Sequence, residues 1–250
     1  MIPLMQADPD ASSVVDRVLQ VLSRVARARK PIAARQIAAE VDLPLSTVYR
    51  LLTSLKKWGL LQEHAETRLY EPGPTGVQLA WGFDQNSVLI SQSRDEIADL
   101  VHRTGESVGL LVAVADQVVC LAMQESEQPL RCSFTRGRAH PLVKGASAKA
   151  LLAFLPAEHV SAVLQKHYKA SPTALVVAMA ELEAIRESRH AVTEGEVDVG
   201  VWGVSAPIVT DNGRLQGTLS LMAPALRIPG REKELIDLTR AAADRIGFRL

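Results

Sequence analysis

Cysteine and aromatic residues are scarce in this 250-residue chain, which has two cysteines and 4% Phe, Trp and Tyr. The cysteines, Cys120 and Cys132, have no CxxC spacing, so we expect buried free thiols and no disulfide framework. Charge of one sign is not in excess either, because 28 Lys/Arg face 28 Asp/Glu. The net charge alone therefore predicts no polyanionic partner.

Long hydrophobic runs are also missing. No window approaches the roughly 18 consecutive apolar residues of a membrane span. The N-terminus has neither the positive region nor the apolar core of a signal peptide. We therefore predict a cytoplasmic protein with no membrane partner. Residues 1–11 contain two prolines and two acids and are expected to form a disordered leader.

Motifs for catalysis and metal binding are absent. The six histidines show no HExxH or other metal-ligand spacing, and the segment around Ser205 lacks the second glycine of a nucleophile elbow. Three alternating acids, Glu194, Glu196 and Asp198, could hold a cation, but such acids on an exposed strand edge are usually solvated. We therefore predict no catalytic residue, no metal and no cofactor, and a protein that is not an enzyme.

The segment LPLSTVYRLLTSLKKWGLL, at 43–61, is patterned as an amphipathic helix. Pro44 suits its start and Gly59 its end. The face opposite its apolar residues contains no carboxylate. The apolar face, at i, i+3, i+4, i+7 spacing, consists of Val48, Leu51, Leu52, Leu55 and Trp58.

Two further helices are predicted before this segment and a hairpin after it. The helices cover 13–28, where Ser13 and Asp16 form a capping box, and 33–41. The strands of the hairpin cover 60–63 and 68–71. Three helices followed by a hairpin is the order of a winged helix-turn-helix, which we place at 12–73.

Basic residues are concentrated here, with nine Lys/Arg against three Asp/Glu between Ser13 and Trp58. In a helix-turn-helix, the start of the second helix of the motif meets base edges in the major groove. Ser46, Thr47 and Arg50 share that side, and Arg50 can contact guanine with two hydrogen bonds. A solvated helix face is the alternative. The candidates for phosphate or wing contacts with double-stranded DNA are Arg35, Tyr49, Ser54, Lys56, Lys57 and Arg68.

From about residue 105 the periodicity changes from helical to alternating. We expect a linker helix at 74–86 and an α+β domain with an antiparallel sheet at 87–250. A long helix is expected from about 86 to 103. Strands are predicted at 107–113, 118–123, 130–135, 192–197, 201–209 and 215–222, and further helices at 147–154, 157–168, 180–189 and 231–248.

Five sequence blocks resemble the IclR family of bacterial transcription regulators, in the family's order. They are IAARQIAAEVDLPLSTVYRLLTSLKKWGLL, LYEPGPTGVQL, RTGESVGLLV, GRAHPLVKGASAKALLAFLP and GVWGVSAPIVTDNGRLQGTLSLMAP. The resemblance implies a GAF-like effector-binding domain after the winged helix-turn-helix, a ligand that is often an organic or aromatic acid, and a homodimer or homotetramer on a pseudo-palindromic operator.

The resemblance also implies where the effector binds. Gly145 and Ala146 would offer exposed backbone amides to a carboxylate before a helix. Gly203 would form a wall, and Ser220 and Met222 would share one face of the last strand. Thr193 stands where some members have a carboxylate, and Met222 where some have a serine. We therefore expect an aromatic or longer acid rather than a very small 2-oxo acid.

Two other functions remain open from the residues themselves. The chain could be a small-molecule-binding enzyme, or an oligomeric scaffold, with an N-terminal interaction domain. A scaffold predicts a filled domain core, whereas an effector-binding domain predicts a cavity. One candidate dimer surface is the apolar stripe of the first helix, which could also pack within its own domain: Val14, Val18, Leu22 and Val25.

Overall fold

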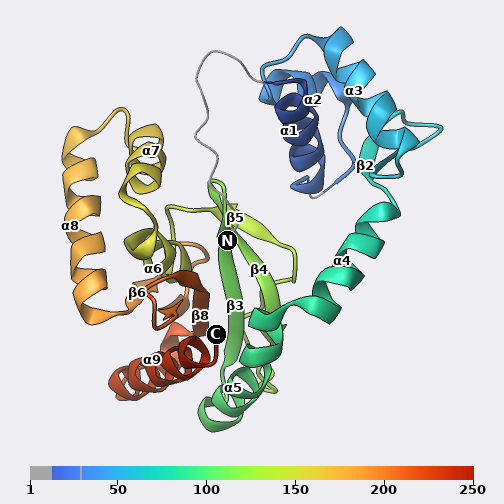
Figure 1. The fold of residues 1–250 in the computed structure, drawn as a ribbon. Helices are drawn as coiled ribbons and strands as arrows, with labels where there is room; N and C mark the ends of the chain where they lie inside the picture. The colour runs from blue at the N-terminus through green and yellow to red at the C-terminus, as the bar shows by residue number, and fades with distance from the viewer. Residues whose placement is uncertain (1–12, 29) are drawn as a thin grey trace. The chain divides into compact units, whose positions relative to one another are not determined.

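The computed structural model describes residues 13–28 and 30–250, so the predicted leader at 1–11 lies outside the described residues. The chain divides into two compact units between Asn86 and Ser87. Figure 1 labels the elements of both units, and each unit is considered by itself. Among the described residues, no helix combines the length and the apolar character needed to cross a membrane.

The first unit is a helix-turn-helix with a two-stranded wing. Its core joins three helices to the wing through Val21, Ile37, Leu52 and Leu61, all at most 2% exposed. The predicted capping box is present, since Ser13 and Asp16 bond each other's backbone amides. The elements are α1 (Val14–Ala26), α2 (Ala34–Glu40), α3 (Leu45–Lys57), the antiparallel pair β1 (Leu61–Glu63) and β2 (Tyr70–Pro72), and α4 (Thr75–Asn86).

Two side chains predicted to be inward are exposed. Trp58 is 73% exposed because α3 ends at Lys57 and Gly59 turns the chain at φ +66°, so Leu61 enters the core in its place. Val14 is 67% exposed because it lies one turn before the part of α1 that packs in this core. The apolar stripe predicted on α1 is therefore divided between the core and the surface.

The second unit is an α+β domain built on a six-stranded antiparallel sheet of order β5-β4-β3-β8-β7-β6. The strands are β3 (Ser107–Val114), β4 (Gln117–Gln124), β5 (Ala139–Pro141), β6 (Ala191–Glu194), β7 (Val201–Val209) and β8 (Leu215–Pro224). The helices are α5 (Val88–Thr104), α6 (Ala146–Phe154), α7 (Ala157–His167), α8 (Pro172–Ser188) and α9 (Glu232–Phe248), with a short 3-10 helix η1 (Ala225–Arg227).

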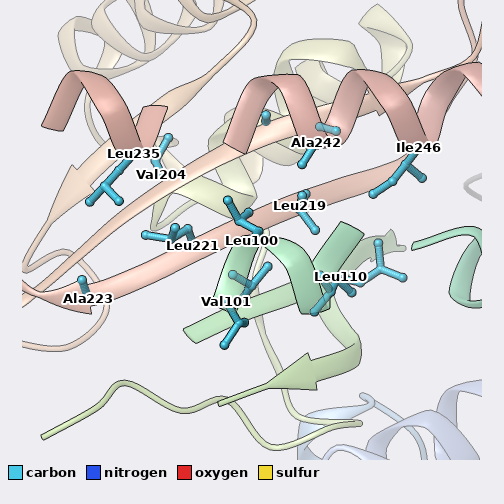
Figure 2. Close-up of a cluster of buried hydrophobic side chains, with 14 of the residues drawn as sticks. Leu100, Val101, Leu110, Val204, Leu219, Leu221, Ala223, Leu235, Ala242 and Ile246 are labelled. Carbon is cyan, nitrogen blue, oxygen red and sulfur yellow. The ribbon is translucent and has the colours of Figure 1, made fainter. Parts of the chain in front are cut away.

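Helices cover both faces of this sheet. On one face, α5 and α9 direct residues such as Leu100 and Ile246 toward Leu219 and Leu221 of β8, as Figure 2 shows. The other face packs against α6, α7 and α8. Because strand residues alternate between faces, Ser220, between Leu219 and Leu221, lies on the opposite face of the sheet from this cluster.

Three sequence predictions need correction here. Residues 130–135 form no strand, because β4 pairs with the short β5 instead and the carbonyl of Leu130 accepts a hydrogen bond from Arg227. β6 ends at Glu194, so residues 195–200 form a β6–β7 loop rather than an extended edge. α8 begins at Pro172, because Pro172 suits a first helical position and Ser171 caps it.

Candidate functional sites

The first site is the acid-free face of α3. The buried side of α3 is fixed by the core, so the opposite side is turned to solvent. Arg50 is exposed there and makes no ion pair with any described residue. Thr47 is half-buried, and Arg35 is exposed as the second residue of α2. The other predicted DNA-contact residues of α3 are all exposed: Ser46, Tyr49, Ser54, Lys56 and Lys57.

Glu63 of β1 modifies the charge of this surface. The ammonium group of Lys56 donates to one carboxylate oxygen of Glu63, and Nη1 of Arg68 lies 3.4 Å from the other. The hydrogen bond from Lys56 is the main reason that the pKa of Glu63 is lowered. Two of the predicted DNA-contact residues, Lys56 and Arg68, therefore share one acid, which no sequence motif indicates. Arg50 has no such partner among the described residues.

The second site is a cavity of about 360 Å³ in the α+β domain. It lies on the face of the sheet that carries Ser205 and Ser220, beside the start of α6 and the β6–β7 loop. A cavity of this size is within the range of small-molecule sites, and it is not what a filled scaffold core would show. All five residues predicted to contact an effector line it: Gly145, Ala146, Gly203, Ser220 and Met222.

The amides at the start of α6 are not exposed, contrary to the sequence prediction. The amide of Gly145, the N-cap residue, donates to Oε2 of Glu196 at 3.0 Å. The amide of Ala146 donates to Oγ1 of Thr193, also at 3.0 Å. Lys149, one turn into α6, holds the second oxygen of Glu196 at 2.6 Å. The protein's own side chains therefore occupy both donors.

Glu196 thus lines the cavity from the β6–β7 loop and not from a strand edge, with its side chain partly exposed to solvent. In the sequence it stands out only as one of three alternating acids. Its partner Lys149 also lies 2.7 Å from Oε1 of Glu181, and these two hydrogen bonds raise the pKa of Lys149 against the opposing effect of burial. Among the described residues, no group of three or more His, Cys, Asp or Glu is placed to hold a metal ion.

The floor of the cavity is formed by β7 and β8. Sheet register pairs Ser205 with Ser220 and Gly203 with Met222. The two serine hydroxyl oxygens are 2.6 Å apart, and Met222 supplies an apolar surface beside them. Trp202 points into the apolar core on the other face, as strand alternation predicts.

The remaining wall combines apolar groups with one thiol. It includes Leu130, Phe134 and Cys132, whose pKa is raised chiefly by burial. Arg227 holds this wall, since its Nη1 donates to the carbonyl of Leu130 at 2.7 Å while its other nitrogens bond Glu106. Of the two predicted buried thiols, Cys120 is buried and Cys132 is only half-buried.

Comparison with known proteins gives a consistent assignment. Residues 14–65 match the model of the IclR helix-turn-helix domain, and residues 85–248 match that of the bacterial transcriptional regulator IclR C-terminal domain. A probable transcriptional regulator of Cupriavidus necator, SauR, is 30% identical over 217 residues, which cover 85% of each chain. The regulator BhcR of Paracoccus denitrificans is 26% identical and covers 96% of this chain and 88% of its own.

Solved structures resemble the chain as well. An IclR-type regulator from Silicibacter superposes with a TM-score of 0.81 at 24% identity, covering 94% of this chain and 96% of its own, which supports the fold. A C-terminal regulator domain from Vibrio cholerae has a TM-score of 0.60 at 34% identity and covers 65% of this chain and 99% of its own. The chain belongs to the IclR family of bacterial transcriptional regulators, with an N-terminal helix-turn-helix domain and a C-terminal effector-binding domain.

Proposed function

We propose that this regulator binds a pseudo-palindromic operator as a homodimer or homotetramer and changes its affinity when a small organic acid enters the cavity. The observation that carries the proposal is that one chain combines a candidate DNA-contacting helix face with a ligand-sized cavity. One domain presents an acid-free helix face on which Arg50 forms no ion pair with any described residue, and the other contains a cavity with hydrogen-bonding groups at one end.

On the DNA side, Arg50 reads a guanine in the major groove, with Ser46 and Thr47 beside it at the start of α3. The remaining contacts hold phosphates and set the register of the helix. Arg68, on the wing, lies at or near the minor groove. The residues proposed to contact phosphates are Arg35, Tyr49, Ser54, Lys56 and Lys57.

On the effector side, a carboxylate binds at the amides of Gly145 and Ala146, and Ser220 contributes a hydroxyl. Met222 and Phe134 provide apolar surface for the rest of the ligand. Because much of the cavity wall is apolar, the proposed ligand is an aromatic or longer acid. The protein acts in the cytoplasm and performs no catalysis.

Coupling between the two sites requires that the effector bind one conformation better than another. The helix α4, which precedes the boundary at Asn86, is the linker through which a change in the effector domain alters the spacing of the recognition helices of a dimer. Exposed apolar residues of α1 are a candidate part of the dimer contact, among them Val14, Val15 and Leu19.

The experiment that tests the function is fluorescence-anisotropy binding across a salt series. The purified protein is titrated onto the duplex upstream of its own gene and onto a scrambled duplex. Tight, discriminating binding that weakens steeply with salt supports the proposal. Equal, weak binding to both duplexes, persisting after genome-wide selection of binding sites with organic acids present, would overturn it.

A further inference from the structure

The cavity contains an internal carboxylate at the position where an acid effector is expected. Glu196 accepts the amide hydrogen of Gly145 at 3.0 Å, at the N-terminal end of the nine-residue helix α6. Amides at a helix N-terminus favour a negatively charged acceptor because of both their free hydrogens and the helix dipole. Glu196 also lines the cavity itself. An entering carboxylate therefore meets a donor that is already bound to a carboxylate.

We propose that Glu196 is an internal competitor of the effector, and that the effector carboxylate displaces it from Gly145 and so releases the β6–β7 loop. This inference rests on the proposed effector role of the cavity. It assigns to Glu196 the tuning of effector affinity and to the loop the structural response to binding.

Lys149 makes this displacement feasible. One oxygen of Glu196 accepts from Gly145 and the other from Lys149, at 2.6 Å. When the effector takes the amide, Glu196 keeps its ion pair with Lys149, so release breaks one hydrogen bond without leaving an unpaired charge.

The β6–β7 loop is built to respond to this release. Gly195 at φ +69° and Gly200 at φ +78° stand at its two ends, in a backbone region that favours glycine. Residues 196–200 all line the cavity. Val197 packs directly on Gly145, where an added Cβ would lie 2.6 Å from Cγ2 of Val197. Loss of the Gly145–Glu196 hydrogen bond therefore loosens this wall of the cavity, while the ion pair with Lys149 still tethers Glu196.

The amide of Ala146 has a different kind of acceptor from the amide of Gly145. Ala146 donates to the neutral hydroxyl of Thr193, and hydrogen bonds to neutral groups are weaker than those to charged groups. An entering carboxylate thus replaces the weaker acceptor Thr193 at Ala146 and the stronger acceptor Glu196 at Gly145. The competition at Gly145 dominates the cost of binding.

The sequence allows both amides to be observed singly. Lys144-Gly145 is the one Lys-Gly pair in the chain, and Gly145-Ala146 is the one Gly-Ala pair. Carbonyl-¹³C lysine with ¹⁵N-glycine therefore gives one correlation peak for Gly145, and carbonyl-¹³C glycine with ¹⁵N-alanine gives one for Ala146. Sodium acetate, as the minimal carboxylate, is titrated against sodium chloride at constant ionic strength in the full-length protein.

We expect Glu196→Ala to change the Gly145 peak before any acetate is added, with a smaller effect on Ala146. The half-saturating acetate concentration at Gly145 should fall roughly tenfold, because a charge-assisted hydrogen bond no longer has to be displaced. Glu196→Gln, which keeps a neutral acceptor, should give an intermediate shift. Glu194→Ala removes an acid from the adjoining strand and should behave as the unmodified protein.

The alternative outcomes separate the two proposals. Equal acetate affinity in all variants would overturn the competitor role and leave the effector site intact. Weaker acetate binding in Glu196→Ala would show that Glu196 only shapes the cavity, and would also overturn it. No response of either amide to acetate in any variant would overturn both the competitor role and the carboxylate site.

Discussion

The hydroxyl oxygens of Ser205 and Ser220 lie 2.6 Å apart on neighbouring strands, in direct cross-strand register. Both side chains are at most 3% exposed, although both line the cavity. Each hydroxyl can donate to the other. The pair thus has a structural role in the sheet and is also available to a ligand.

The structural role predicts non-additive losses of stability. Ser205→Ala or Ser220→Ala leaves one buried hydroxyl without its partner and should lower the free energy of unfolding by about 1–3 kcal/mol, whereas the double variant should lose less than the sum. The measurement is urea unfolding followed by the fluorescence of the buried Trp202, in a background without Trp58 and Trp81. Additive losses would show that the two hydroxyls do not stabilise each other.

The ligand role predicts a separate effect of Ser220→Ala. We expect the effector concentration that gives half of the DNA response to rise by roughly three- to tenfold, the value of one hydrogen bond. Ser93→Ala is the matched control, because the buried hydroxyl of Ser93 donates to the carbonyl of Leu89 within its own helix, α5. An unchanged response in Ser220→Ala would remove Ser220 from the effector site.

Arg50→Ala should reduce both operator affinity and discrimination. Loss of a bidentate contact to a base is worth about 1–3 kcal/mol, so the ratio of operator to scrambled-duplex affinity should fall by one to two orders of magnitude. Lys57→Ala should instead weaken binding to both duplexes and lower the salt slope by about one. Lys233→Ala, an exposed cation of the other domain, serves as control. Full operator affinity in Arg50→Ala would refute the base contact.

Glu63→Gln should strengthen DNA binding. Glu63 bonds both Lys56 and Arg68 and partly neutralises them. Without the charge of Glu63, these two cations should attract the DNA more strongly. We expect roughly a two- to tenfold gain at low salt, fading as salt screens the charges. Glu66→Gln removes an equal charge from the wing tip without either contact, and its gain should be smaller. Weaker binding in Glu63→Gln would mean that Glu63 positions Lys56 for its phosphate.

Local patterns were sufficient to predict most of the fold. Helical spacing identified α3 because Val48, Leu51, Leu52 and Leu55 are fixed by one core, and Gly59 marked its end through its positive φ. Two-residue alternation placed Ser220 and Met222 on one face of β8. These predictions held because the signals act over a few residues and no tertiary contact opposes them.

The errors came where tertiary contacts decide. The alternation of apolar residues at 130–135 predicted a strand, but these residues line the wall of a cavity. That role depends on contacts with distant segments, which a local pattern does not indicate. Trp58 fitted the helical stripe, yet Leu61 took its place after the turn. Glu196 is 51 residues from its partner Gly145, so nothing in its neighbourhood indicated that contact.

The two cysteines give an independent report on the cavity. Burial raises the pKa of Cys120 to about 11, whereas Cys132 is half-buried in the cavity wall with a pKa also raised by burial. Because the thiolate is the reactive form, both should react more slowly with iodoacetamide than a free thiol at about pH 8, and faster as pH rises. We expect Cys132 to react first, as mass spectrometry of timed samples would show. A ligand in the cavity should slow its modification. In Cys132→Ser protein only the slower labelling of buried Cys120 should remain. Modification of Cys120 at the rate of Cys132 would show that burial does not separate the two thiols. An acid that changes DNA binding without protecting Cys132 would bind outside this cavity.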